Sequence, residues 1–396
     1  MSDDERAIGG GWRPSQRRML VLGIGAAFFG LVNSGFEVVA PLWAVNELGL
    51  DAEGWAFLRS LRMVGTCVGI LVLGVLAERL GSRLLAALAM AGAGLAFAGM
   101  AAGWSPFILL PLFGALISAT FVNFNALTQR VSERRPGLAN ALYRAVGATM
   151  GILAPVIATQ LAARWGAYAP VLMCGGVLLG LGGLVMLCYP DPSSADPRPA
   201  LATVWARYRA AFTDRRLWLV VVLDQGMAAA TAAIGTFAAL RFTRTLGLSE
   251  PSWGLLATCA GVASIAAILA TAWLVTRLDL ARVLAIAWGG SAIGALALGL
   301  SPSAPLAMAG FLLYAALSTT TSVPMSLWLT RLAPGGSLAT IFTVHKLFQS
   351  GTSAAAIAVV GALEPQLGMA TLMWMGGVIG VPIAITAWCL RAPGDK

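Results

Sequence analysis

Charge is scarce in this sequence. Only 11% of its 396 residues are charged, whereas 58% are hydrophobic. Soluble proteins average about 25% charged and about 45–50% apolar residues, so this composition excludes an ordinary water-soluble enzyme. It also excludes a disordered chain, which combines few apolar residues with a high net charge. The class that remains is a protein that crosses a membrane many times.

Lysine occurs only at Lys346 and Lys396, and neither residue ends a G-x-x-x-x-G-K stretch. The P-loop that binds nucleotide phosphates is therefore absent, and energy for uphill transport would have to come from an ion gradient or a separate subunit. Histidine occurs once, and the five cysteines lie in apolar runs without C-x-x-C spacing. This pattern indicates neither a metal site nor a disulfide framework. We expect no cofactor and no nucleic-acid partner.

Apolar runs long enough to cross a bilayer fill most of the chain. A membrane-spanning helix requires about 20 mostly apolar residues, and the sequence has twelve such runs, roughly 19–45, 54–77, 84–104, 106–128, 138–163, 168–189, 217–240, 253–275, 282–300, 304–329, 338–362 and 368–390. The period-2 alternation of a membrane β-barrel is absent. The sequence predicts an all-α membrane protein with twelve transmembrane helices.

Arginine placement gives the orientation. With a cytoplasmic N-terminus, most arginines fall in inside segments, and only Arg164, Arg241 and Arg244 fall in outside loops. Cytoplasmic loops carry the excess of Lys and Arg in membrane proteins. We therefore expect both termini in the cytoplasm and a multi-pass protein of the bacterial inner membrane.

The chain carries an internal duplication. With an offset of 198 residues, Arg17 falls on Arg215, Trp55 on Trp253 and Arg79 on Arg277, and the offset drifts to 200–201 further along. Parallel six-helix repeats with a site between them characterise one large transporter architecture. The duplication predicts an N-terminal tail (1–18), a six-helix bundle (19–189), a cytoplasmic linker (190–216), a second six-helix bundle (217–390) and a C-terminal tail (391–396).

One connection carries a motif. The residues between the second and third runs read GVLAERLGSR, from Gly74 to Arg83. This stretch resembles the G-x-L-x-D-R-x-G-R-[RK] loop of the major facilitator superfamily, with Glu in place of Asp and Ser in place of the first Arg of the final pair. With the twelve spans and the duplication, the resemblance covers nearly the whole chain. It implies the fold of that superfamily, in which two pseudo-symmetric six-helix bundles form the protein. It also implies a conformational-switch loop made of Gly74, Glu78, Arg79, Gly81 and Arg83.

Two further features resemble the drug–proton antiporters of the same superfamily. In the first run, Glu37 stands four residues before Pro41, and in the fifth run Gly147 and Gly151 precede Ala154-Pro155. Where this chain has Ala154-Pro155, the antiporters have Gly-Pro. The arginine that they carry in the fourth span has no counterpart in residues 106–122 of this chain. The resemblance implies proton-coupled export.

Ionisable residues within a membrane cost several kcal/mol unless they are paired or hydrated, so they are the first candidates for a functional site. Within the predicted spans lie Glu37, Arg59, Arg62, Arg144, Asp224, His345 and Lys346. Some of them can be ion pairs that only lock helices together.

Two polar stripes lie on duplicated helices. Asn33 and Glu37 share one face of the first span, and Asp224 and Thr231 share the equivalent face of the seventh. In the superfamily that the chain resembles, these two helices line the central cavity, so both stripes are candidate substrate or proton sites. Arg62, on the second span, lies at the same expected depth in the membrane as Glu37. The two form a candidate ion pair, which is either a fixed bridge or a proton-sensitive switch.

A basic cluster is predicted nearer the cytoplasm. Arg144, His345 and Lys346 lie at similar depth in the fifth and eleventh spans, with Gln349 beside them. They either extend to the inner surface or receive an anionic or zwitterionic substrate. The polar run 318–322 before Pro324 could unwind locally and offer hydroxyls or carbonyls to that substrate.

Three functions follow. The first is a secondary active transporter working by alternating access, which exports a small organic or amphipathic compound in exchange for protons. The second is a proton-coupled importer of an anionic or zwitterionic nutrient. The third, a membrane enzyme or non-transporting assembly factor, is disfavoured because the sequence shows no catalytic constellation. The expected partners are a small-molecule substrate, protons or another coupling ion, and the lipid bilayer around a monomer.

Overall fold

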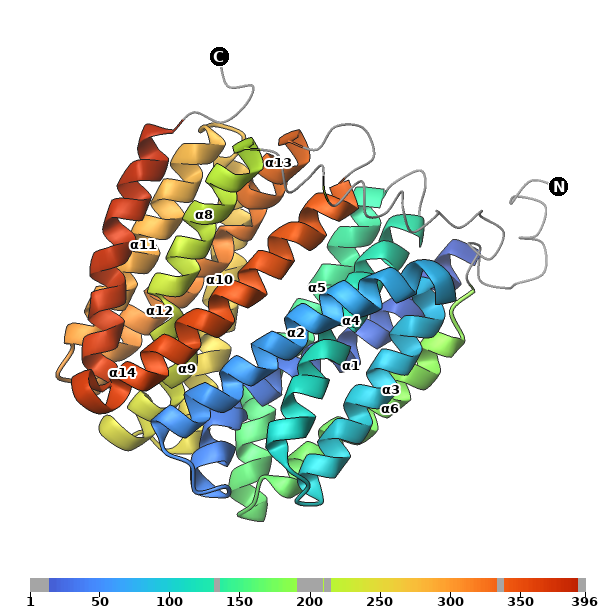
Figure 1. The fold of residues 1–396 in the computed structure, drawn as a ribbon, viewed down its shortest axis with the longest axis horizontal. Coiled ribbons are helices and arrows are strands. Elements are labelled where there is room, and N and C mark those ends of the chain that lie inside the picture. Colours follow the sequence, from blue (N-terminus) through green and yellow to red (C-terminus); the bar gives the residue numbers. More distant parts are fainter. Residues whose placement is uncertain (1–13, 132–135, 191–208, 210–214, 333–337, 391–396) are drawn as a thin grey trace. The chain divides into compact units, whose positions relative to one another are not determined.

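The structure is a computed structural model that describes residues 14–131, 136–190, 209, 215–332 and 338–390. These residues form helices and contain no strand. The linker 190–216 and both tails fall largely outside the described residues. The helices are α1 (Pro14–Asn46), α2 (Ala52–Leu80), α3 (Ser82–Ala101), α4 (Pro106–Val131), α5 (Pro136–Trp165), α6 (Ala169–Leu187), α8 (Arg215–Ala230), α9 (Ala232–Leu240), the π-helix η3 (Arg241–Thr245), α10 (Glu250–Leu274), α11 (Leu280–Leu300), α12 (Ala304–Thr320), α13 (Ser322–Leu332) and α14 (Leu338–Cys389) (Figure 1).

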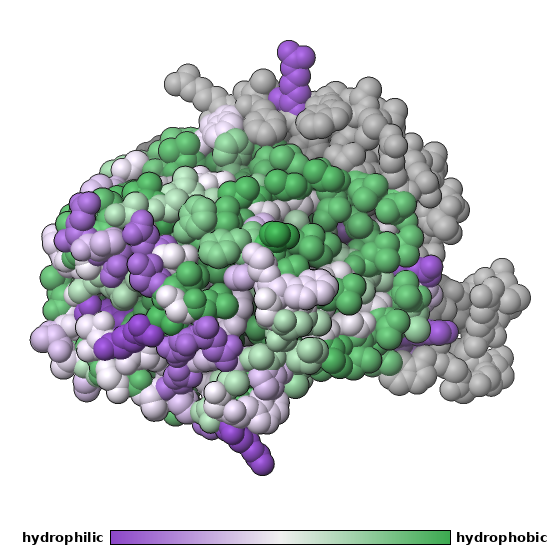
Figure 2. All heavy atoms as spheres, turned by 60° about the horizontal axis from the view of Figure 1, so that its bottom comes forward, coloured by the Kyte–Doolittle hydropathy of each residue, from purple (hydrophilic) through white to green (hydrophobic). Residues whose placement is uncertain are grey.

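Eleven stretches of the described residues are long and apolar enough to cross a membrane. The last of them, Thr343–Cys389, is 47 residues long and bends at Gly368, whose φ is 75°. It therefore accounts for two of the predicted spans, and the prediction of twelve transmembrane helices is confirmed. Large hydrophobic side chains such as Leu95, Ile108 and Leu269 lie exposed on the helices, and hydrophobic residues cover much of the face in Figure 2. This surface suits contact with lipid.

The contacts group the chain into two compact units. One comprises residues 1–37 and 65–199, and the other comprises residues 38–64 and 200–396. The bundle boundaries predicted from the sequence stay a prediction. The grouping differs from them because residues 38–64, the end of α1 and the start of α2, join the unit that holds α8 to α14.

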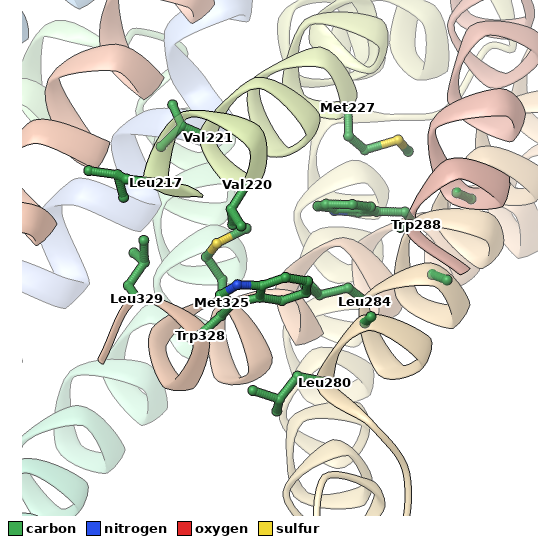
Figure 3. Packing of buried hydrophobic residues seen from close by; sticks show 14 of the residues in the cluster. Leu217, Val220, Val221, Met227, Leu280, Leu284, Trp288, Met325, Trp328 and Leu329 are labelled. Carbon is green, nitrogen blue, oxygen red and sulfur yellow. The ribbon is translucent and has the colours of Figure 1, made fainter. Parts of the chain in front are cut away.

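Each unit has its own core. In the first unit, the rings of Phe36, Phe97 and Phe113 pack with centroids 4.7–5.4 Å apart. In the second unit, the core cluster includes Trp288 of α11 and Met325 and Trp328 of α13 (Figure 3). These apolar side chains fix α8, α11, α13 and α14 around the polar cavity described below.

The duplication is visible in local geometry. Gly49 and Gly247 occupy equivalent positions, and both have positive φ, 67° and 73°. Glycine populates this conformation without steric cost. The next helix is capped in the same way in both repeats: the Asp51 carboxylate accepts from the Gly54 N–H at 2.7 Å, and the Ser249 hydroxyl accepts from the Ser252 N–H at 3.4 Å.

Candidate functional site

A polar cavity of about 160 Å³ lies within the second unit. Its wall combines hydroxyl groups, one carboxylate, one amide and an indole, contributed by Asp224, Met227, Ala228, Thr231, Trp288, Ser291, Tyr314, Ser318, Thr321 and Gln349. A cavity needs only about 10–15 Å³ of such volume to hold one water molecule, so this one has room for several. A wall of this size and chemistry suits a small polar organic molecule rather than a bare ion.

Two helix boundaries border the cavity. The polar run 318–322 contains the boundary between α12, which ends at Thr320, and α13, which begins at Ser322, but Thr321 keeps a helical backbone (φ −58°, ψ −26°), so the local unwinding of this run stays a prediction. A second boundary, which the sequence did not predict, separates α8 from α9 at Thr231. The hydroxyls of Thr231 and Thr321 donate to backbone oxygens of Met227 and Ser318, at 3.0 and 2.8 Å. Because each hydroxyl uses its proton on the backbone, its oxygen can accept a hydrogen bond from a ligand.

The carboxylate of the cavity wall is paired with the histidine. The Nε2 atom of His345 on α14 lies 2.9 Å from Oδ2 of Asp224 on α8, and the amide of Gln225 donates to the same oxygen at 3.0 Å. Asp224 is 9% exposed. The imidazole and the carboxylate can hold one proton between them, so that gaining or losing it changes the charge of the cavity wall by one.

Lys346 lies beside this pair. Its ammonium group donates to Oε1 of Gln349 at 2.7 Å, and Asp224 acts on it electrostatically. The side chain of Arg144, the third member of the predicted basic cluster, lies outside the described residues. Within the part that the structure describes, the two basic groups therefore surround an acid, and the positive charge of the cluster is partly offset.

Tyr314 and Trp288 were not predicted as site residues. The Tyr314 hydroxyl lies near the hydroxyls of Thr231 and Ser318, and all three residues line the cavity. Trp288 lies close to Met227 in the view of Figure 3, and both side chains line the cavity. A signal was present for Tyr314, since the chain has only five tyrosines and this one lies within an apolar span.

Reciprocal hydrogen bonds join the ends of α1 and α2 to α9, η3 and α10. We call this group of six residues the clasp: Val38, Asn46, Trp55, Thr236, Arg244 and Trp253. The Trp55 indole donates to the Thr236 carbonyl at 2.9 Å, and the Trp253 indole donates to the Val38 carbonyl at 3.3 Å. Val38 and Thr236 are themselves equivalent under the 198-residue offset. The two bonds are therefore one bond repeated by the duplication.

The centre of the clasp is polar. The Arg244 guanidinium donates to Oδ1 of Asn46 at 2.9 Å, and the Asn46 amide donates to Glu250 at 2.9 Å. Asn46 and Arg244 are equivalent positions under the same offset. A residue that meets its own equivalent lies on a two-fold axis, so the axis that relates these parts of the repeats passes between Asn46 and Arg244.

Arg59 connects the clasp to the cavity. Its guanidinium donates to the Gly235 carbonyl at 2.5 Å, and its charge acts on Tyr314 of the cavity wall. The two carbonyls that accept from α2, those of Gly235 and Thr236, both belong to α9. This short helix begins at the cavity and is held by α2 through its fourth and fifth residues.

The remaining predicted site residues are placed as follows. Arg62 is 5% exposed, and Asn33 and Glu37 are half-buried on α1. Glu37 belongs to the first unit and Arg62 to the second, and their pairing stays a prediction.

The switch loop is described in part. Gly81 makes the turn between α2 and α3 with φ 85°, and the Arg83 guanidinium donates to the Tyr189 carbonyl at 3.1 Å. Arg18 donates to the next carbonyl, that of Pro190, at 3.1 Å. Both cations thus bind carbonyls just beyond the end of α6, where cations interact favourably with the helix dipole. The side chains of Gly74, Glu78 and Arg79 lie outside the described residues.

Comparison with known proteins agrees with this fold. Residues 22–238 match the family model of the Major Facilitator Superfamily. The chain is 29% identical over 176 residues to sugar efflux transporter A of Escherichia coli, a match that spans 42% of this chain and 43% of that protein.

Solved structures give the same fold over nearly the whole length. The crystal structure of the nucleoside transporter NupG matches 94% of this chain and 98% of its own, with a TM-score of 0.76 and 13% identity. The D-xylose–proton symporter matches 95% of this chain and 98% of its own, with a TM-score of 0.73 and 17% identity. At these identities the similarity shows the fold.

Proposed function

The chain belongs to the Major Facilitator Superfamily and is a multi-pass membrane transporter, and on that premise we propose that it exports a small, neutral, hydroxyl-rich compound such as a sugar in exchange for protons. The cavity bounded by Asp224, Tyr314 and Gln349 is the binding site of this proposal. The export direction is supported by the partial match to a sugar efflux transporter. The chain would lie in the bacterial inner membrane as a monomer with both termini in the cytoplasm.

The chemistry of the cavity wall carries the substrate class. Thr231, Ser291, Tyr314, Ser318 and Thr321 bring five hydroxyl groups to a small volume. Hydroxyl and amide groups can donate to and accept from the hydroxyls of a polyol. The indole of Trp288 offers an apolar face, the usual complement to a few polar groups in a ligand pocket.

The charge balance disfavours an anionic substrate. An anion moved out of water needs fixed positive charge around it. Asp224 lies 2.9 Å from His345 and acts on Lys346, so this carboxylate offsets part of the positive charge. We therefore favour a neutral substrate over the anionic or zwitterionic nutrient of the import hypothesis.

The Asp224–His345 pair is the proton site of this proposal. Its carboxylate lies in the cavity wall, so the proton of the pair and the substrate can influence one another through charge and hydrogen bonds. A ligand hydroxyl that accepts from His345 or donates to Asp224 binds one protonation state better than the other. Such a difference in affinity between two states is what couples two binding equilibria.

The test is transport by purified protein in liposomes, with radiolabelled mono- and disaccharides as the first panel. We expect a pH gradient to drive accumulation of at least one of them by the wild type. Asp224→Asn and His345→Gln should lose that accumulation and keep exchange of substrate across a membrane without a gradient. Asp279→Asn is the matched control, because Asp279 is an exposed carboxylate bonded to Arg282 outside the cavity.

Two results would contradict the proposal. Full gradient-driven accumulation by Asp224→Asn would remove the pair from coupling. Transport of organic anions but of no sugar, together with weaker anion binding in Lys346→Gln, would support the import hypothesis instead.

A further inference from the structure

The contact between α2 and α14 brings carboxylates together at one end of the two helices. The hydroxyl of Ser60 donates to the Ala354 carbonyl at 2.9 Å. Two turns further along α14, a Cβ atom placed on Gly361 would lie 2.5 Å from Cβ of Ala56 and 3.7 Å from the Glu53 carbonyl oxygen. The two helices therefore run antiparallel in close contact, and Gly361 is required because no larger side chain fits there.

Glu53 and Glu364 lie at the same end of this contact, and the charge of Glu53 acts on Glu364. Each residue lies three positions, about one helical turn, beyond the Ala56–Gly361 contact, on the side away from Ser60. A third carboxylate, that of Asp51, lies at the start of α2, where it accepts a hydrogen bond from the Gly54 N–H. Glu364 lies in the turn before Gly368, between the two hydrophobic spans of α14. Burial and the charges of Asp51 and Glu53 raise its pKa above the ordinary value of 4.5.

The charges that act on Glu364 are those of Asp51 and Glu53, and both are negative. Helix α9 and the half of α11 at this end, 291–300, contain no charged residue. Other charged groups nearby have partners of their own. Arg59 bonds to Gly235, and Arg244 and Glu250 bond to Asn46. Arg241 bonds to the carbonyls of Leu298, Gly299 and Ser301, and Glu47 lies at the surface.

The fold itself does not require these acids. Under the 198-residue offset, Asp51 corresponds to Ser249 and Glu53 to Pro251. The neutral Ser249 caps its helix as Asp51 does, and the second repeat forms its helix without an acid at the position of Glu53. The first turn of α10 carries its acid one position earlier, at Glu250, so a carboxylate at the position of Glu53 is particular to α2.

We propose that Glu53 and Glu364 form a proton-sensitive latch, in which acid stabilises the contact between α2 and α14 and neutral or alkaline pH loosens it. Two ionised carboxylates held together repel one another, and a proton on either removes that repulsion. The placement of this latch at the outer surface rests on the proposed orientation, whereas the latch itself depends on no substrate. Acid outside the cell would then hold the contact closed and slow the transport cycle.

The pH window follows from linkage. The contact raises the pKa of Glu364, so the contacted state binds the proton more tightly than the separated state. The stabilisation is complete below the ordinary pKa of 4.5 and is lost as the pH rises through the raised value. For one proton, the ratio of contacted to separated molecules falls by at most about tenfold per pH unit within this window.

The experiment measures distances between spin labels in a cysteine-free background, without substrate. Phe57 on α2 and Val359 on α14 are more than half exposed and can carry the labels. In nanodiscs between pH 4.5 and 8, we expect the short-distance population of the wild type to decrease as pH rises. Glu364→Gln and, separately, Glu53→Gln should each keep that population high across the range, whereas Asp279→Asn should behave as the wild type.

Either variant alone is sufficient if the other does not fold. A distance distribution that is independent of pH in the wild type would overturn the latch. So would an unchanged pH dependence in the glutamine variants. Loss of sugar transport in the liposome experiment would leave these distances unaffected, so the latch and the proposed function fail separately.

Discussion

Replacing Trp55 by Phe tests whether the clasp is a two-state contact that the transport cycle must open. Trp55 is 1% exposed, and its indole N–H bonds to the Thr236 carbonyl at 2.9 Å. Phenylalanine keeps an aromatic ring in that place and removes the donor. A buried hydrogen bond contributes about 0.5–1.5 kcal/mol net, so the ratio of closed to open clasp should fall by about 2- to 13-fold.

The duplication supplies a graded comparison. The equivalent bond from Trp253 to Val38 is longer, at 3.3 Å, so Trp253→Phe should shift the ratio less than Trp55→Phe. The two bonds share neither donor nor acceptor, so the free-energy changes in the double variant should add to within about 0.5 kcal/mol. Trp104→Phe is the control, since Trp104 is 67% exposed and does not belong to the clasp.

The assay is the reaction rate of a single cysteine, placed at an exposed position beside the clasp, with a membrane-impermeant maleimide. The rate should rise in the order Trp104→Phe, Trp253→Phe, Trp55→Phe and the double variant. Equal rates in all four would mean that the clasp does not open. A larger effect of Trp253 than of Trp55 would refute the reasoning from bond geometry.

Three further predictions rest on described contacts or on the sequence. Gly361→Val should separate α2 from α14 and lower the melting temperature in detergent, because a Cβ atom at this position would lie 2.5 Å from Cβ of Ala56; an unchanged melting temperature would show that the two helices need not approach this closely. Arg241→Met should lower the free energy of unfolding in detergent by about 2 kcal/mol or more. The guanidinium binds three carbonyls near the end of α11, and hydrogen bonds to charged groups contribute about 1.5–3 kcal/mol each. An unchanged melting temperature would contradict this. Glu78→Ala or Arg79→Ala should slow turnover and leave substrate affinity intact, since the loop would bias a conformational equilibrium rather than a pocket; wild-type turnover would remove the loop from the mechanism.

The fold could be predicted because hydrophobic length and the offset repeat are properties of the chain itself. Twelve apolar runs gave twelve spans, whereas the unwinding predicted for the polar run before Pro324 stays a prediction, since the backbone of Thr321 is helical. The boundary at Thr231 was missed because the surrounding residues are apolar helix formers with no Pro or run of hydroxyls.

The candidate site could be predicted only in part. Asp224, Thr231 and Gln349 line the cavity as polar residues on the expected helices. The pairing of Asp224 with His345 was not foreseen, because they are 121 residues apart and spacing along each helix says nothing about which helices meet. Tyr314 and Trp288 were overlooked since an aromatic residue in an apolar span has the same signature whether it faces lipid or a cavity.

The Asn46–Arg244 contact has a consequence for assembly from fragments. At a two-fold axis, two copies of the same half would bring identical side chains together. Two C-terminal halves would place one Arg244 guanidinium against another, each beside the Glu250 carboxylate of the opposite half, because Glu250 bonds to the residue at the Asn46 position. Two N-terminal halves would meet through two amides without a charge-assisted bond. A chain divided in the linker and expressed as two pieces should therefore form the mixed pair in preference to a pair of N-terminal halves, with this divergent position making the choice.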